Sequence, residues 1–298
     1  MFNMAVPTHE SSENIVIKQR SMFRQTMDRL VRNRSAMIGS ILLMIIVILC
    51  LLAPVIAPQG YNHQDLNAKY QPPSWKHLCG TDNLGRDIFT RILYGGRISL
   101  YIGFASTVFS AVAGTFIGAI AGFYGGKSDN ITMRIMDIIS SLPSVLLAIT
   151  IAAALGTGVN TTIFAIGISS IPIFARRSRA PVIQLKNEEY IEAARSINAS
   201  RLRIMVRHLF PNILSPLIVQ FTINVAMSII LAAGLSFLGM GVQPPNPEWG
   251  TIITASKNYL LEHSYMVTMP GIAIALTIVA LNLLGDGLRD CLDPRLKI

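Results

Sequence analysis

The chain is poor in charged residues. Asp, Glu, Lys and Arg make up only 14% of its 298 residues, whereas 51% are hydrophobic. Soluble domains carry about 25% charged residues, so this chain has too little polar surface to cover a water-soluble domain. The apolar content excludes a disordered chain, and the 22 glycines follow no triplet repeat of the collagen kind. This composition is typical of a protein that lies in a membrane.

Cysteine and histidine are also scarce. The three cysteines lie far apart without a CxxC motif, and the five histidines show no metal-ligand spacing. The GxSxG and HExxH patterns of hydrolases are missing. Residues 125–128 end like a phosphate-binding loop, but Ala121 stands where that pattern requires glycine. We therefore expect that the chain is not an enzyme and binds no cofactor or metal of its own.

Long uncharged segments predict the membrane-spanning helices. Five blocks contain no Asp, Glu, Lys or Arg, namely Ser35–Gln64, Ile98–Gly126, Ile138–Ala175, Leu209–Pro247 and His263–Gly285. A spanning helix needs roughly 20 apolar residues, so the third block is long enough for two spans, with a turn at 156–160 between them. The sequence thus predicts an all-α membrane protein with six transmembrane helices, at about 36–56, 98–123, 135–155, 161–175, 213–238 and 267–284.

The distribution of basic residues predicts the orientation. With six spans and the N-terminus inside, 19 of the Lys and Arg residues fall on the cytoplasmic side and six on the other side. Cytoplasmic loops are enriched in Lys and Arg, which explains the net charge of +9 without nucleic acid. The predicted organisation is a cytoplasmic N-terminal tail (1–35), a first transmembrane helix (36–56), an extracytoplasmic loop (57–97), a five-helix core (98–284) that includes a cytoplasmic loop (176–212), and a cytoplasmic C-terminal tail (285–298).

The predicted spans hold almost no ionisable residue. An ion-driven carrier usually keeps such residues in its spans, and the single candidate here is Asp137, which follows Arg134 by three residues. We interpret the two as an i,i+3 pair at the membrane interface, with a role in gating as the alternative. In the second span Gly114, Gly118 and Gly122 share one helix face. Small residues of this kind favour close helix packing, although they could also line a subunit interface or a substrate path.

The 176–212 loop is long and basic. Asn187 is placed to cap a short helix whose acidic first turn complements the helix dipole. Asn198 stands where a left-handed residue ends such a helix. Ser200 is expected to cap a second helix that ends at Pro211. We expect this helix–turn–helix to contact another protein, with an amphipathic helix resting on anionic lipid as the alternative.

One motif in this loop carries a family resemblance. Glu192-Ala193-Ala194-x3-Asn198, followed by His208-Leu209-Phe210-Pro211, resembles the EAA loop of ABC importer permeases. In that family the loop forms a coupling helix that docks into a cleft on the ATPase subunit, and glycine stands in place of Asn198. The resemblance implies that the ATPase-coupling residues are Glu192, Ala193, Ala194, Asn198 and Pro211.

Three further stretches narrow the resemblance. Residues 80–87, 235–250 and 285–295 resemble signatures of the dipeptide/oligopeptide/nickel permease group, and in particular its second, C-type permease. Residues 170–176 also resemble glutathione permeases. The resemblance implies the type I permease fold of ABC importers. It also implies import of dipeptides, oligopeptides or glutathione by alternating access across the bacterial cytoplasmic (inner) membrane.

The same resemblance implies an assembly. Its members are a second homologous permease that forms a heterodimer with this chain, two ATP-binding subunits that use ATP and Mg²⁺, and an extracytoplasmic peptide-binding protein. Membrane lipid surrounds the pair, and no nucleic acid is expected. A nickel importer of the same group is one alternative. A channel or scaffold protein that works alone in the membrane is the alternative from a different class.

The topology is testable by cysteine labelling. In a cysteine-free background, Lys186→Cys and Lys257→Cys are expected to react with a membrane-impermeant maleimide from opposite sides, because the 176–212 loop is predicted to be cytoplasmic. Intact cells should therefore show labelling at position 257 only. Detergent-opened membranes are the control, in which both positions should react. Labelling of position 186 in intact cells would contradict the six-span topology.

Overall fold

The structure of the chain is a computed structural model that describes residues 30–292, and these residues are almost all helical. The predicted N-terminal tail up to residue 29 and the last six residues of the C-terminal tail lie outside the described residues. Among the described residues the long helices are α2 (Arg34–Leu51), α4 (Ile88–Tyr124), α7 (Val159–Leu185), α10 (Phe210–Phe237) and α12 (Tyr265–Leu292). Each is long and apolar enough to cross a membrane.

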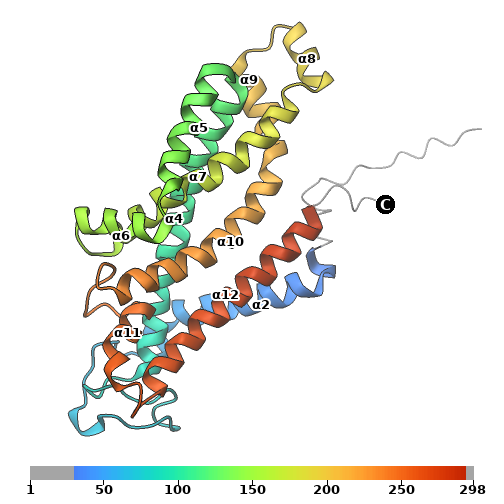
Figure 1. Cartoon of the computed structure of the whole chain (residues 1–298). Coiled ribbons are helices and arrows are strands. Elements are labelled where there is room, and N and C mark those ends of the chain that lie inside the picture. Colours follow the sequence, from blue (N-terminus) through green and yellow to red (C-terminus); the bar gives the residue numbers. More distant parts are fainter. Residues whose placement is uncertain (1–29, 293–298) are drawn as a thin grey trace, which may run out of the picture.

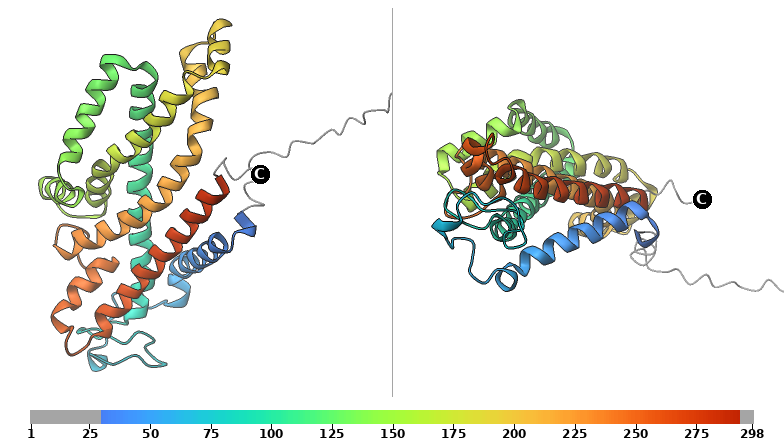
Figure 2. Two further views of the ribbon diagram at one scale, coloured as in Figure 1. Left: turned by 45° about the vertical axis from the view of Figure 1, so that its right-hand side comes forward. Right: turned by 90° about the horizontal axis from the view of Figure 1, so that it is seen from below.

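Shorter elements join these helices. They are α3 (Ala53–Ile56), α5 (Gly126–Ser141), α6 (Ser144–Leu155), α8 (Glu189–Ser196), α9 (Arg201–Ile204) and α11 (Trp249–Ser256), with a π-helical turn at Met205–Leu209 and 3₁₀ turns at Leu66–Ala68 and Lys257–Tyr259. The π turn joins α9 to α10 without a break, so that residues 201–237 form one helix. α12 packs along both α2 and α10, as Figures 1 and 2 show.

α5 and α6 are together apolar and long enough for a sixth crossing, with a bend between them. The Lys186 ammonium donates to the Gly122 carbonyl, which places the end of α4 and the start of α5 beside the α8 end of the molecule. The Gly158 N–H, just after α6, donates to the Gly241 carbonyl, which lies beyond the other end of α10. The pair therefore runs from the α8 end of the molecule to the level at which α10 ends, and the two helices meet at 86°. With the bent pair counted as one span, the described residues contain the predicted six.

Most helices extend beyond the uncharged blocks. α4 begins at Ile88, so the loop expected at 57–97 ends at Asp87, whose side chain caps the helix by accepting the Thr90 N–H at 2.8 Å. α7 continues through Leu185, and α12 continues through Leu292. An uncharged run marks only the part of a helix that the hydrocarbon layer requires. Because backbone hydrogen bonding continues in water, charged residues can extend the same helix.

The charge pairs differ from those predicted. Asp137 does not pair with Arg134, because Arg176 of α7 donates from Nη2 to Asp137 Oδ1 at 3.3 Å. The Arg176 Nη2 group also donates to Ser140 Oγ at 2.8 Å. Both side-chain partners of Arg176 therefore lie on the last turns of α5. A pair between different helices could not be found from spacing along one helix.

The glycine stripe of α4 packs against α7. A side chain at Gly114 would meet the backbone at Ile171 and Ala175, and a side chain at Gly118 would overlap the Ala175 carbonyl. Small residues on this face therefore let the two helices approach closely. Of the alternatives for this stripe, packing within the subunit is the one that the structure supports.

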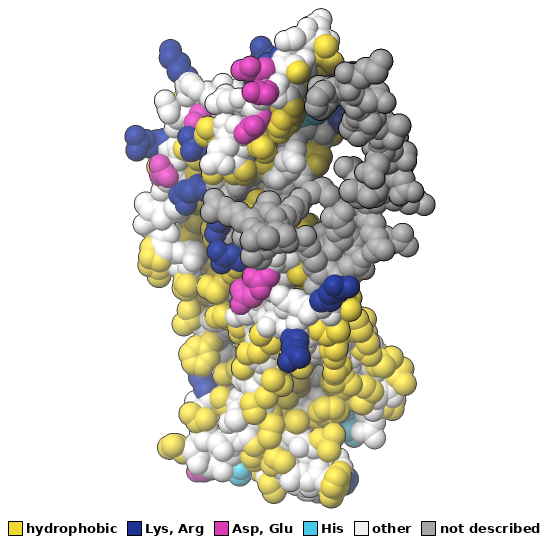
Figure 3. Space-filling view, turned by 90° about the vertical axis from the view of Figure 1, so that its right-hand side faces the viewer, with side chains coloured by type: hydrophobic (Ala, Val, Ile, Leu, Met, Phe, Trp, Pro, Cys, Tyr) yellow, Lys and Arg dark blue, Asp and Glu magenta, His cyan; other side chains and the backbone are white. Residues whose placement is uncertain are grey.

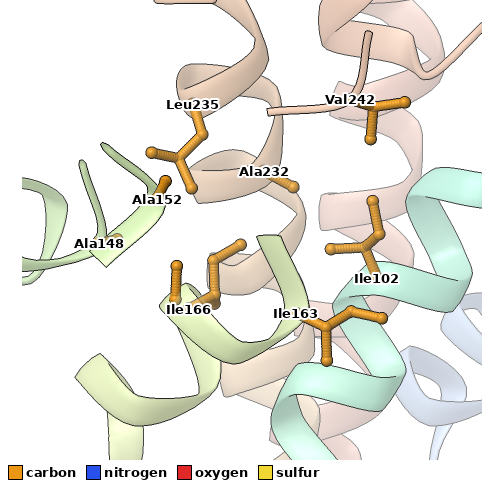
Figure 4. Close-up of a cluster of buried hydrophobic side chains, with 9 residues drawn as sticks. Ile102, Ala148, Ala152, Ile163, Ile166, Ala232, Leu235 and Val242 are labelled. Carbon is orange, nitrogen blue, oxygen red and sulfur yellow. The ribbon is translucent and has the colours of Figure 1, made fainter. Parts of the chain in front are cut away.

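A cluster of buried aliphatic side chains holds α4, α6, α7 and α10 together. Figure 4 shows Ile102 of α4, Ala148 and Ala152 of α6, Ile163 and Ile166 of α7, and Ala232 and Leu235 of α10. Away from the core the molecule is strongly apolar on its outside. In Figure 3 hydrophobic side chains cover most of the lower half, while Lys, Arg, Asp and Glu gather mainly on the upper half. This distribution matches helices that cross a hydrocarbon layer and then enter water.

We predict that Gly118→Leu destabilises the subunit. The new side chain would overlap the Ala175 carbonyl, which is rigid helix backbone, and overpacking of this kind costs roughly 1–3 kcal/mol. Gly234→Leu in α10 is the matched control, because a Cβ there meets no atom within 4 Å. Thermal unfolding in detergent should show a lower midpoint for the α4 variant only. Equal midpoints for the two variants would contradict close α4–α7 packing.

Candidate functional site

The predicted protein-binding loop forms a protrusion at one end of the molecule. α8 lies at this end, beyond the ends of α4, α5 and α7 (Figure 1). The connection between the two long helices is shorter than the predicted 176–212 loop, because α7 ends at Leu185 and the helix containing α9 and α10 begins at Arg201. α8 is therefore held between two rigid helices rather than on a long flexible loop.

The start of α8 differs from the prediction. Glu188, and not Asn187, is the N-cap residue, with extended backbone angles and no side-chain cap hydrogen bond. The Glu188 carbonyl accepts the N–H groups of Ile191 and Glu192, which begins the helix. Asn187 instead lies in the turn after α7, where its N–H donates to the Gln184 carbonyl. The acidic first turn, with Glu189 and Glu192, is present as predicted and favours the helix dipole.

The end of α8 confirms the predicted role of Asn198. Its φ angle is 59°, in the left-handed region. The Asn198 N–H donates to the Arg195 carbonyl at 2.9 Å, and the Ala199 N–H donates to the Ala194 carbonyl at 3.0 Å. These two bonds form a Schellman motif. Asparagine is one of the few residues besides glycine that adopts this backbone conformation readily, so α8 ends at a defined residue and the chain reverses at once.

The second helix confirms one predicted end and corrects the other. Ser200 caps its start by accepting the Arg203 N–H at 3.3 Å. Pro211 does not end it, because the chain continues as α10. The Phe210 N–H reaches back to the Met205 carbonyl, five residues earlier. This wider π turn accommodates the proline, which lacks an N–H and would clash with the carbonyl of the preceding turn in a regular helix. Pro211 therefore lies in the first turn of α10.

Burial divides the EAA residues into two groups. Ala194 is buried together with Ile191, and both belong to a cluster that includes Phe174 of α7 and Leu209. Glu192, Ala193 and Asn198 are exposed. Of the two alanines that the sequence placed together at a docking surface, only Ala193 is available to another protein. Ala194 instead packs α8 onto the body of its own subunit.

Two exposed residues, Tyr190 in α8 and Ile197 at its C-cap, were missed by the sequence analysis. Tyr190 is 42% exposed and Ile197 is 80% exposed. With Ala193 they follow the i, i+3, i+7 spacing that places residues on one helix face. Burial raises the pKa of the Tyr190 phenol and the charge of Glu188 adds to this, so the hydroxyl stays neutral. Tyr190, Ala193 and Ile197 thus form an apolar strip beside Glu192. The i, i+3, i+7 spacing of these residues in the sequence could have indicated it.

Two contacts fix this loop to the end of α4, and an ion pair beside it joins α7 to α5. The Lys186 ammonium donates to the Gly122 carbonyl at 2.9 Å, and the Arg201 guanidinium lies over the Tyr124 ring at 5.7 Å. Arg179 of α7 holds Asp129 of α5 in a bidentate ion pair at 2.5 and 2.6 Å. Paired bonds of this kind fix orientation as well as distance. A force on α8 is therefore passed to α4, α5 and α7 together.

The opposite end carries the loops between α3 and α4 and between α10 and α12. Within the first loop, Asp82 and Arg86 form an ion pair at 2.7 Å. Trp75 and Leu261 are each 98% exposed, and Leu66 and Leu78 are also exposed. Such a group of exposed apolar side chains is typical of a surface that contacts another protein. Across residues 30–292 no three His, Cys, Asp or Glu side chains gather closely enough to hold a metal ion.

Comparison with known proteins places this geometry in a family. Residues 114–298 match the model for "Binding-protein-dependent transport system inner membrane component", and residues 21–73 match "N-terminal TM domain of oligopeptide transport permease C". The di/tripeptide transport system permease protein DppC of Pseudomonas aeruginosa is 43% identical over 89% of each chain. The glutathione transport system permease protein GsiD of Escherichia coli is 42% identical over 89% of this chain and 88% of its own.

A solved structure shares the fold. A chain of the MetNI methionine ABC transporter, described in inward facing conformations, superimposes with a TM-score of 0.57 at 18% identity, over 68% of this chain and 96% of its own. With the six crossings and the α8 loop, these similarities confirm the expected fold and the expected family. The chain belongs to the family of inner membrane components of binding-protein-dependent transport systems and has the fold of an ABC importer permease.

Proposed function

We propose that the chain is one permease subunit of an ATP-driven importer for dipeptides and oligopeptides. The 43% identity to a di/tripeptide permease over most of both chains supports this substrate class, and the 42% identity to a glutathione permease supports a small peptide more generally. In this proposal the chain pairs with a second, homologous permease. Peptide crosses at their interface as the pair alternates between two conformations, one open to each side of the membrane.

The protruding α8 is the observation that carries the proposal. A helix that projects beyond the spans, ends in a rigid Schellman motif and exposes Glu192, Ala193 and Ile197 is suited to a cleft on another protein. Two ATP-binding subunits would provide that cleft, one for each permease. They would hydrolyse ATP with Mg²⁺, and this chain would contribute movement rather than catalysis.

The opposite end would face the extracytoplasmic binding protein. Exposed Trp75, Leu78 and Leu261 offer an apolar surface there, while the basic residues that favour the cytoplasm gather beside α8. In this proposal α2 begins and α12 ends on the cytoplasmic side. The Asn33 amide, at the start of α2, donates to Asp290 near the end of α12.

The coupling role predicts specific variants. Glu192→Ala should weaken co-purification of the ATP-binding subunits and lower peptide uptake, because a hydrogen bond to a charged group contributes roughly 1.5–3 kcal/mol. Ala193→Trp should do the same by adding bulk to the exposed face. Asn198→Gly should be tolerated, because glycine adopts the left-handed conformation at less cost. Pull-down of the tagged permease and uptake of labelled dialanine are the measurements.

Glu262→Ala is the matched control. It removes the same charge from an exposed residue at the opposite end of the molecule, and it should leave ATPase association unchanged. Ala194→Trp is a second comparison, because it should disturb the packing of α8 on its own subunit and reduce the yield of folded protein. Normal ATPase association and uptake in both Glu192→Ala and Ala193→Trp would show that α8 is not the docking element.

A further inference from the structure

The bend between α5 and α6 exposes polar groups partway through a membrane crossing. α5 covers 16 residues before the bend and α6 covers 12 residues after it, so the bend lies well inside the crossing. Every residue from Ser140 to Leu146 is exposed in the isolated subunit. The chain between the two helices passes through Leu142 and Pro143, both with extended backbone angles.

Such a bend cannot face lipid. Irregular backbone at membrane depth is found only where protein buries it or where it lines a water-filled cavity, because hydrocarbon offers no hydrogen-bond partner. The last carbonyls of α5 and the first N–H groups of α6 have no partner inside their own helices. Nothing else in residues 30–292 covers this stretch, as its exposure shows. The bend therefore faces water or the neighbouring subunit.

An ion pair marks the same surface. Arg176 and Asp137 lie 3.3 Å apart with side chains that are 45% and 56% exposed. The hydrogen bonds of Arg176 all leave from Nη2, to Asp137, Ser140 and the Met136 carbonyl. Its Nε and Nη1 groups have no hydrogen-bond partner in the described part of the chain. Ionisable residues inside membrane spans are rare and mark substrate or ion pathways.

We propose that the α5–α6 bend lines the path of the peptide, and that Arg176 and Asp137 contact the charged ends of the peptide as it passes. This inference rests on the proposed function and adds a contact site to it. The free donors of Arg176 suit a carboxylate, which a guanidinium binds with two parallel hydrogen bonds. Asp137 suits the peptide ammonium. Leu142 and Val145, both exposed beside them, suit apolar peptide side chains.

The position of the pair allows both contacts without breaking the fold. Two ion pairs join α5 to α7, and the bidentate Arg179–Asp129 pair closer to α8 still holds the helices together when the Arg176–Asp137 pair opens. Partial exposure leaves each charge accessible to a third group. The peptide carboxylate would therefore replace Asp137 as the partner of Arg176, and the peptide ammonium would replace Arg176 as the partner of Asp137. The helices would stay in place.

The first experiment measures water at the bend. Single cysteines replace Ser144 at the bend and Met44 on the exposed face of α2 in the complete importer in membranes. A small charged thiol reagent should modify Ser144→Cys, and excess dialanine during ATP turnover should slow that reaction. Met44→Cys should stay unmodified, because its helix is apolar on that side. An unreactive Ser144→Cys would overturn the proposal that the bend lines the path.

The second experiment separates contact from structure. Arg176→Gln and Asp137→Asn should each lower dialanine uptake at least tenfold, with normal assembly and ATPase association. Arg134→Gln is the matched control. Arg134 lies on α5, as Asp137 does, but it has no ion-pair partner in the described residues. The exchanged pair, Asp137→Arg with Arg176→Asp, keeps an ion pair but reverses its direction. Continued loss of uptake in this variant is the expected result.

The outcomes distinguish failure of the contact role of Arg176 and Asp137 from failure of the proposed peptide substrate class. Restored uptake in the exchanged pair would mean that the ion pair only supports the fold, and it would overturn the contact role. Wild-type uptake in both single variants would do the same. If the wild-type importer, assembled with its binding protein, takes up neither dialanine nor longer peptides, the proposed substrate class itself is wrong.

Discussion

Close contact between α4 and α7 is the interaction on which the rest of the structure depends. Gly114 and Gly118 let the two backbones meet without side chains between them. α7 leads directly into the segment that carries α8, and the end of α4 provides the Gly122 carbonyl that anchors Lys186. The position of α8 relative to the membrane is therefore set by the geometry of this helix pair. A change in the angle between α4 and α7 would move α8 with it.

Ion pairs extend this connection to α5. Asp129 and Arg179 join α5 to α7 beside α8, and Asp137 and Arg176 join the same helices nearer the bend. In a chain with only 14% charged residues, two such pairs on one helix hold α5 to α7 both beside α8 and near the bend. Movement at the ATP-binding subunits would reach the bend through three packed helices. The backbone hydrogen bonds of these helices are internal, so the movement need not expose polar groups to lipid.

Sequence patterns predicted the parts of the structure that depend on local chemistry. Apolar runs found the crossings, small-residue spacing found the α4–α7 contact face, and Asn198 and Ser200 were found because caps depend on one residue and its neighbours. Two local predictions were also wrong, because Glu188 instead of Asn187 starts α8 and a π turn carries the helix past Pro211. The other errors involve tertiary contacts. Ala194 and Ala193 look alike in sequence, but packing on Phe174 buries only the first. Asp137 pairs with Arg176 across helices, and no spacing rule along one helix could show this.

The π turn before Pro211 lets one helix run from Arg201 to Phe237 although it contains a proline. The hydrogen bond from the Phe210 N–H to the Met205 carbonyl closes a turn that holds one more residue than a turn of α-helix. Because the wider turn absorbs the extra residue, α9 continues α10 as a single helix without a flexible joint. A tilt of α10 would therefore displace α8 as well, by an amount that grows with its distance from the membrane.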